Sequence, residues 1–231
     1  MRSKAPGSGW RSASTQVFPI MMGYLPIGFA YGVLAQKADL SIFNAFLMSL
    51  IVFAGSAQLI AVELFAISTG PISIILTTFI VNLRHLLMSA SLSPYVDRWA
   101  RSEKAGFAFE LTDETFALHA LRGAHGKLDK KETFIINILA HSAWILGTGL
   151  GFILGRQILE TEPLALDFAL PAMFIALLVM QLSSKPKVIV AVVSGLFSVG
   201  LYYFGLQRWY VIAATIIGAT LGVWIEQWMK A

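Results

Sequence analysis

Apolar residues gather in seven stretches, each close to the length of a membrane-spanning helix. A helix rises about 1.5 Å per residue, so about 20 apolar residues cross the hydrocarbon core of a bilayer. The pattern therefore predicts an all-α, polytopic helical bundle in a membrane. The seven predicted spans are residues 16–36, 42–68, 71–92, 132–155, 163–183, 187–204 and 209–228.

Two segments depart from this apolar pattern. Residues 1–15 are rich in Ser, Gly and basic side chains, and we expect them to form a disordered tail ahead of a single transmembrane domain, residues 16–231. Residues 93–131 carry many charges, but their middle, residues 107–121, is apolar around a small polar group. We expect that middle part to be either an eighth, polar span or a helix that enters the membrane from one side.

Several predicted spans contain prolines, which interrupt a helix, or glycines, which have no side chain to keep a neighbouring helix away. Pro19 and Pro26 lie in the first span, and Gly147 and Gly151 lie in the fourth. Proline removes a backbone hydrogen bond and kinks a helix, whereas glycine lets two helices approach closely. These residues therefore predict either tight helix packing or locally broken helices. Many transporters build their midplane sites from interrupted helices.

Composition supports the membrane interpretation. The chain is 57% hydrophobic and only 13% charged, with a mean hydropathy of +0.72, whereas a soluble domain is about 25% charged. The net charge of +4 comes from basic residues in the tail and loops, where they orient membrane proteins. No basic stripe with interleaved aromatic residues indicates nucleic-acid binding. The lack of cysteine excludes disulfides, thiolate catalysis and thiolate metal sites.

The loop charges orient the C-terminal half. Cytoplasmic loops carry an excess of Lys and Arg. Suppose that Arg122 and the three lysines of residues 127–131 are cytoplasmic. The alternation of the following spans then places Lys185, Lys187 and Lys230 in the cytoplasm as well, so most basic residues of this half lie there. The sequence thus predicts a cytoplasmic C-terminus and leaves the side of the N-terminus open.

The third span has one polar face. At about 100° per residue, Thr77, Asn82, Arg84 and His85 fall within about 160° of arc, and leucine and isoleucine fill the opposite arc. An arginine at mid-membrane costs about 3 kcal/mol or more, so it normally faces a cavity or a partner. We expect Arg84 to face a cavity; the alternative is that it lies near a helix end and extends to the membrane surface.

The second span carries Ser49, Ser56 and Glu63 at seven-residue intervals, on one face if the helix is continuous. The small residues of Phe53–Gln58 lie between them. They indicate either close helix contact or a local unwinding that exposes backbone amides and carbonyls to a ligand.

The polar segment contains Asp113 and Glu114 next to each other. Adjacent carboxylates point about 100° apart on a helix, so they are not a pair aimed at one atom. They indicate either a solvated helix start, where acids meet the positive end of the dipole, or a site for a proton or an ammonium group. For His141 and Asn137, four residues apart on the fourth span, we expect ordinary polar contacts between helices.

Patterns typical of hydrolases, metalloenzymes and nucleotide-binding proteins are absent from the sequence. We therefore expect no catalytic residue, no metal and no cofactor, and a protein that is not an enzyme. A non-transporting assembly subunit of a membrane complex and, less favoured, a membrane-embedded enzyme are the alternatives to a transporter.

Four motifs, in this order and spacing, resemble the AzlC family, the large subunits of bacterial branched-chain amino-acid exporters. They are FAGSAQ (53–58), NLRHLLMSASL (82–92), LTDETFAL (111–118) and LDFALPAMFIALL (166–178). The resemblance implies an inner-membrane carrier that exports valine, leucine, isoleucine and related neutral amino acids such as methionine. It also implies a small, separately encoded membrane subunit of the AzlD type.

Such a substrate presents a carboxylate, an ammonium group and an apolar branch. The planar fork of Arg84 suits a carboxylate, and the intramembrane acids suit an ammonium group or a proton exchanged for the substrate. The predicted substrate-binding residues are Gly55, Ser56, Gln58, Asn82 and Arg84. The predicted proton-coupling residues are Glu63, His85, Asp113 and Glu114.

Overall fold

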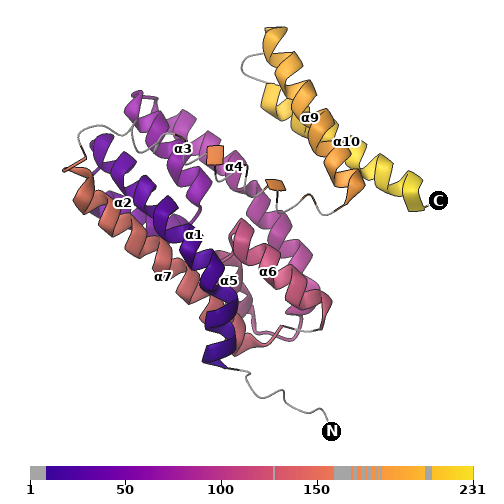
Figure 1. Cartoon of the computed structure of the whole chain (residues 1–231), viewed down its shortest axis with the longest axis horizontal. Helices are drawn as coiled ribbons and strands as arrows, with labels where there is room; N and C mark the ends of the chain where they lie inside the picture. The colour runs from indigo at the N-terminus through magenta and orange to yellow at the C-terminus, as the bar shows by residue number, and fades with distance from the viewer. Residues whose placement is uncertain are drawn as a thin grey trace. The chain divides into compact units, whose positions relative to one another are not determined.

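A computed structural model of the chain describes residues 9–126, 128–158, 184–205 and 210–230, together with positions 168, 171, 172, 175, 178, 179 and 182. The regular elements of these residues are all helices (Figure 1). The chain divides into two compact units, residues 1–173 and 174–231, which are described separately below. The single transmembrane domain expected from the sequence stays a prediction.

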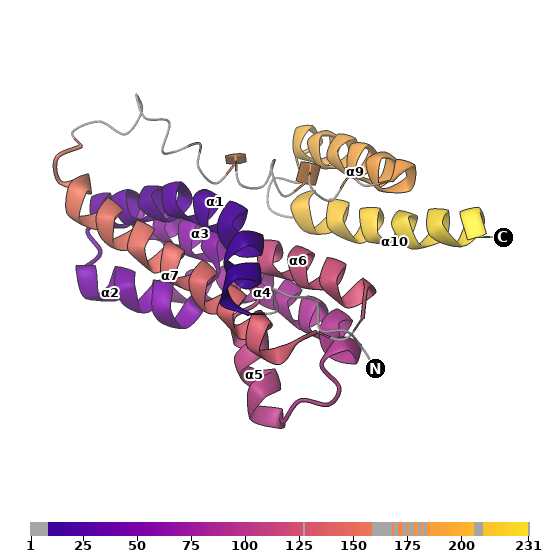
Figure 2. The ribbon, with the colours of Figure 1, turned by 60° about the horizontal axis from the view of Figure 1, so that its bottom comes forward.

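The core of the first unit is a pair of long helices, α1 (Trp10–Lys37) and α7 (Lys130–Gly155), which lie side by side (Figures 1 and 2). Glycines allow this close packing. A Cβ atom added to Gly28 would lie 2.8 Å from the Trp144 carbonyl oxygen, and one added to Gly147 would lie 2.6 Å from the Leu25 carbonyl oxygen. Gly28 and Gly147 therefore serve close helix contact.

Helix α1 begins earlier than the sequence predicts. Residues 10–15, expected to belong to the disordered tail, form its first turns. They are held there because Ala13 is buried in the core and the Ser12 hydroxyl donates a hydrogen bond to Glu132 on α7.

The second apolar stretch is a broken helix. Helix α2 (Ile42–Leu47) continues as a π-helical turn, η1 (Met48–Val52), and a new helix, α3 (Gly55–Ala66), begins after two non-helical residues. Phe53 has a φ of 39° in the left-handed region, which is uncommon for a residue with a side chain. The structure thus has the local unwinding, and the continuous face expected for Ser49, Ser56 and Glu63 does not form.

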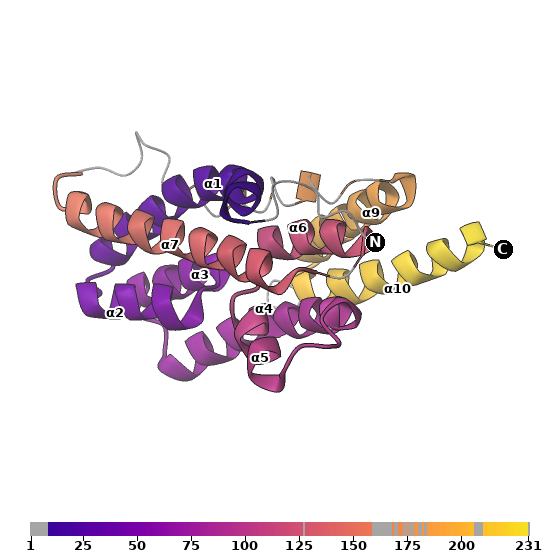
Figure 3. The same cartoon turned by 90° about the horizontal axis from the view of Figure 1, so that it is seen from below.

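The polar segment is also divided. Helix α4 (Pro71–Leu92) and the short turn η2 (Ser93–Tyr95) are followed by α5 (Arg101–Phe109) and α6 (Asp113–Ala124), which run in different directions (Figure 3). One continuous helix over residues 107–121 therefore does not form, and a helix that enters the membrane from one side, now α6 alone, stays a prediction. Thr112 begins a new helix there, because its hydroxyl accepts the hydrogen bond of the Thr115 N–H.

The two broken stretches share an architecture. Each ends in a 12-residue helix, α3 or α6, and each is followed by a long helix, α4 or α7. The long helices carry related sequences, Thr-Phe-Ile-Val-Asn at 78–82 and Thr-Phe-Ile-Ile-Asn at 133–137. Paired interrupted helices of this kind are typical of transporters built from repeats.

The second unit contains α9 (Lys185–Tyr203) and α10 (Tyr210–Lys230), which pack against each other. Across the described residues, four helices are long and apolar enough to cross a membrane: Trp10–Lys37, Pro71–Tyr95, Lys130–Gly155 and Lys185–Tyr203. The predicted second span is broken, and the predicted fifth span, 163–183, lies largely outside the described residues. The structure thus supports an all-helical membrane protein with four candidate spans.

Candidate functional site

A pocket in the first unit lies where α3 and α6 begin. Its walls come from both helix breaks and from the three long helices α1, α4 and α7. The residues that line it are Tyr24, Ile27, Phe53, Ala54, Gly55, Ser56, Arg84, His85, Thr112, Asp113, Glu114 and Trp144. One side is therefore charged and the other is aromatic and aliphatic, as in pockets that bind small amphiphilic molecules.

Arg84 occupies the middle of α4 and points into this pocket. One guanidinium nitrogen lies 2.7 Å from an Asp113 carboxylate oxygen, and the other donates to the Ser56 hydroxyl. The Arg84 side chain is only 25% exposed, and its Nε has no hydrogen-bond partner among the described residues. A partly buried guanidinium with an unused donor is suited to an additional anionic ligand.

The first turn of α3 adds backbone donors to the same wall. The N–H groups of a helix start have no intrahelical acceptor, and the helix dipole favours an anion there. Gly55 is needed at this position because a Cβ atom would lie 2.8 Å from the Trp144 ring. The break before α3 thus places the N-terminus of this helix and the Arg84 side chain at the same pocket.

The two acids at the start of α6 have different partners. Asp113 pairs with Arg84, whereas Glu114 accepts a 2.7 Å hydrogen bond from the Tyr24 hydroxyl. The acids begin a capped helix, as one of the two sequence interpretations expects, but this helix start faces a pocket instead of open solvent.

The pocket is closed in this structure. The volume open to the centres of water molecules is about 20 Å³, which suits a water molecule and is too small for an amino acid. Arg84 and Asp113, which form an ion pair, both line this space. A ligand of amino-acid size therefore requires the pocket to widen.

The other predicted site residues lie outside the pocket. Gln58 is fully buried and donates to the Ser49 hydroxyl. The Asn82 side-chain oxygen is buried without a partner among the described residues. Glu63 is exposed on α3. Of the nine predicted residues, the structure therefore brings six together: Gly55, Ser56, Arg84, His85, Asp113 and Glu114.

Sequence reasoning missed the other side of the pocket. Tyr24, Phe53 and Trp144 are all buried there, and the rings of Phe53 and Trp144 each meet the Tyr24 ring edge to face. In a chain this rich in aromatic residues, no local signal separates three pocket aromatics from ordinary core residues. Only their contacts across three segments identify them.

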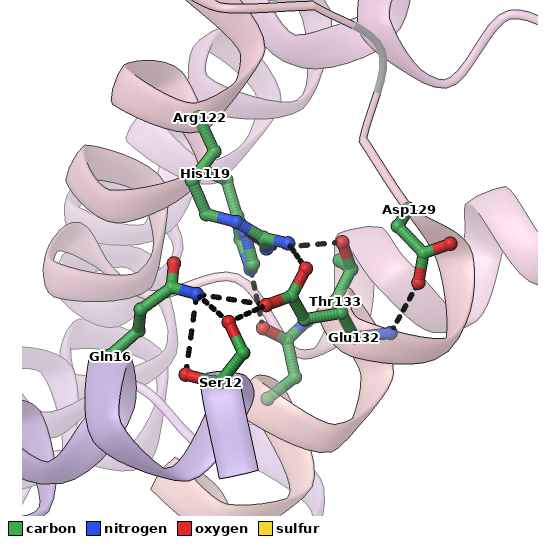
Figure 4. A network of polar contacts seen from close by, with 8 residues as sticks. Ser12, Gln16, His119, Arg122, Asp129, Glu132 and Thr133 are labelled. Carbon is green, nitrogen blue, oxygen red and sulfur yellow. Dashed lines mark hydrogen bonds and ion pairs between the residues drawn. The ribbon is translucent and has the colours of Figure 1, made fainter. Parts of the chain in front are cut away.

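A second ion pair lies at the far end of α6. Arg122 in the last turn of this helix is 2.6 Å from Glu132 on α7. Glu132 also accepts hydrogen bonds from Ser12 and Gln16 of α1, so this network joins three helices (Figure 4). Burial lowers the pKa of the neighbouring His119 to about 4, which keeps that ring neutral near pH 7.

Comparison with known proteins places this architecture in a family. A family profile described as "AzlC protein" matches residues 19–158, which include both helix breaks and the whole pocket. An uncharacterized membrane protein of Archaeoglobus fulgidus is 32% identical, over 97% of this chain and 99% of its own length. The inner membrane protein YgaZ of Escherichia coli is 31% identical, over 98% of this chain and 95% of its own.

A third relative carries a functional name. The branched-chain amino acid transport protein AzlC of Bacillus subtilis is 30% identical, over 94% of this chain and 84% of its own. No solved structure matches the chain. The match over most of the first unit, together with relatives that extend over nearly the whole sequence, shows that the chain belongs to the AzlC family.

Proposed function

We propose that this chain is the transport subunit of a secondary carrier that exports branched-chain and related neutral amino acids, namely valine, leucine, isoleucine and methionine. The observation that carries the proposal is the pocket in which Arg84, Asp113 and the start of α3 meet an aromatic wall. These groups match the three parts of the substrate. The name of the Bacillus subtilis relative supports the same substrate class.

The substrate takes the place of the internal ion pair. Its carboxylate binds the Arg84 guanidinium and the N–H groups at the start of α3, and its ammonium group binds Asp113. The branched side chain lies against Ile27, Phe53 and Trp144, which line the pocket. Since a zwitterion replaces one positive and one negative contact, binding leaves no unpaired charge in the membrane.

Export against a gradient requires an energy source, and we assign it to proton exchange. Asp113 and Glu114 lie at the pocket with His85 beside them. The exposed position of Glu63 removes the main reason to include it in this group. The family resemblance further favours an AzlD-type partner subunit and the bacterial inner membrane, and the loop charges favour a cytoplasmic C-terminus.

Counterflow in vesicles tests the proposal. The chain, co-expressed with the small neighbouring subunit, is placed in vesicles loaded with unlabelled valine, and entry of labelled valine is measured. We expect Arg84→Ala to lower counterflow at least about 30-fold, since truncating one partner of a buried charge pair costs roughly 2–5 kcal/mol. Arg101→Ala, at the exposed start of α5, is the matched control and should transport normally.

Two results would contradict the proposal. Unchanged counterflow in Arg84→Ala would remove the guanidinium from the substrate path. If wild-type vesicles carried no valine while the substitutions abolished recovery of the small subunit in a pull-down, the chain would be an assembly subunit. Equal amounts of inserted protein, measured on the same vesicles, make the comparison valid.

A further inference from the structure

A buried histidine and a partly buried acid lie near the pocket without lining it. His141 on α7 has its Nδ1 atom 3.1 Å and 3.2 Å from the two carboxylate oxygens of Glu110, the residue that ends α5. Its Nε2 atom lies 2.9 Å from the Ser49 carbonyl oxygen. The side chains of His141 and Glu110 are 9% and 16% exposed, so both ring nitrogens have their partners inside the protein.

These contacts fix where the hydrogens are. A carbonyl oxygen only accepts, so Nε2 of His141 must carry a hydrogen. Nδ1 then faces two carboxylate oxygens, and that contact is attractive only with a proton between them. The pair is either an imidazolium with a carboxylate or a neutral imidazole with a carboxylic acid. Both descriptions contain one titratable proton and carry no net charge.

The pair connects both helix breaks to α7. Ser49 belongs to the π-helical turn just before the first break, and Glu110 lies in the connection between α5 and α6. The Phe53 ring stacks on the His141 ring, with centroids 3.9 Å apart. Loss of the proton would set the Glu110 carboxylate against an unshared electron pair on Nδ1. The contact would then open, and with it the link between the two breaks.

Other charged groups on the neighbouring helices are engaged elsewhere. On α4, Arg84 pairs with Asp113 of α6, and the Glu114 carboxylate accepts from the Tyr24 hydroxyl of α1. Among the described residues, Glu110 is the charged side chain that contacts His141. The proton of this pair is therefore distinct from the charges of the substrate pocket.

We infer that Glu110 and His141 form a proton-binding site, separate from the Arg84 pocket, whose proton holds the two helix breaks together. The inference rests on the proposed function for its role in transport: it places the exchanged proton on this pair and not on the pocket acids Asp113 and Glu114. The proton leaves or returns as the breaks move. This exchange of one proton for one neutral zwitterion moves one net charge across the membrane. With the membrane potential held at zero, it gives about a tenfold concentration ratio per unit of pH gradient.

The transport experiment uses Glu110→Gln, which replaces the titratable acid with a neutral amide that donates to Nδ1. We expect this variant to keep valine counterflow, which needs no net proton movement, and to lose the roughly tenfold accumulation per pH unit. Glu103→Gln is the matched control, because this acid is on the same helix and forms an exposed pair with Lys130. Accumulation in Glu110→Gln equal to that of the wild type would overturn the inference.

A second measurement does not depend on transport. In ¹⁵N-histidine spectra of the purified complex, with the His141 signals assigned by their loss in His141→Asn, we expect Nε2 to stay protonated and Nδ1 to move with pH. In Glu110→Gln, Nδ1 should not move between roughly pH 5 and pH 9. An unprotonated Nε2, or a wild-type Nδ1 signal that ignores pH, would overturn the proton-binding site. Absence of valine counterflow in the wild type would refute the proposed function, and the spectra would still decide this inference.

Discussion

Helix α6 carries an ion pair at each end, and the two pairs differ in what surrounds them. At the end of the helix, Glu132 accepts from Arg122, Ser12 and Gln16, so its carboxylate is fully engaged within the protein. At the start, the Arg84–Asp113 pair lines a pocket, and Arg84 Nε has no partner among the described residues. The Arg122–Glu132 pair thus joins three helices, whereas the Arg84–Asp113 pair has a guanidinium N–H that is still able to bind a ligand.

The largest predicted difference comes from converting the acid of each pair to its amide. Asp113→Asn removes the negative charge that would receive the substrate ammonium group, so we expect valine affinity to fall about 30-fold or more, from a loss of roughly 2 kcal/mol. Glu132→Gln should leave valine affinity within about twofold and lower the unfolding free energy by roughly 1–3 kcal/mol. Calorimetric titration with valine and thermal unfolding of the same samples measure both quantities.

One result would contradict this comparison of the two ion pairs. If Glu132→Gln weakened valine binding as much as Asp113→Asn did, both ends of α6 would contribute equally to the site. The assignment of a structural role to Arg122–Glu132 and a binding role to Arg84–Asp113 would then be wrong.

A smaller effect is expected from Gly55→Ala at the start of α3. The added Cβ would lie 2.8 Å from the Trp144 ring, so the ring or the helix start must shift. Because a small displacement of binding groups lowers a rate strongly, we expect counterflow to fall about tenfold, with a loss of stability of roughly 1–3 kcal/mol. Gly70→Ala is the control, since a Cβ there meets nothing within 4 Å. Equal counterflow in the two variants would show that the start of α3 does not shape the site.

Six of the residues that line the pocket could be predicted from the sequence, because their positions depend on features within one helix, such as the polar face of α4. The polar face of α4 placed Arg84 and His85 on one side of a helix, and both line the pocket. The small residues of Phe53–Gln58 predicted either close helix contact or a local unwinding, and the structure has a helix break directly before Gly55. In each case the decisive information lies within one or two helical turns.

The remaining features depend on contacts that span the sequence. The seven-residue spacing puts Glu63 on one face with Ser49 and Ser56 only if the helix is continuous, and the structure has a π-helical turn and a break between Ser49 and Ser56. Glu110 and His141 are 31 residues apart, on helices whose meeting follows from the division of the polar segment. No local pattern in either helix predicts the contact between Glu110 and His141, because the two residues meet only when α5 ends next to α7.

The smallest predicted effect concerns the Tyr24 hydroxyl, which connects α1 to the start of α6. Tyr24→Phe removes the hydrogen bond to Glu114 and the contact with Thr112 but keeps the ring against Trp144. A typical intramolecular hydrogen bond contributes roughly 1 kcal/mol, so we expect valine binding to weaken about fivefold. Tyr31→Phe, whose hydroxyl reaches the Ala45 carbonyl oxygen at 3.4 Å, should not change binding, and calorimetric titration measures both variants. A Tyr24→Phe variant with wild-type affinity would mean that Glu114 does not need α1 to be placed at the pocket, and the substrate contacts would then rest on α3, α4 and Asp113 alone.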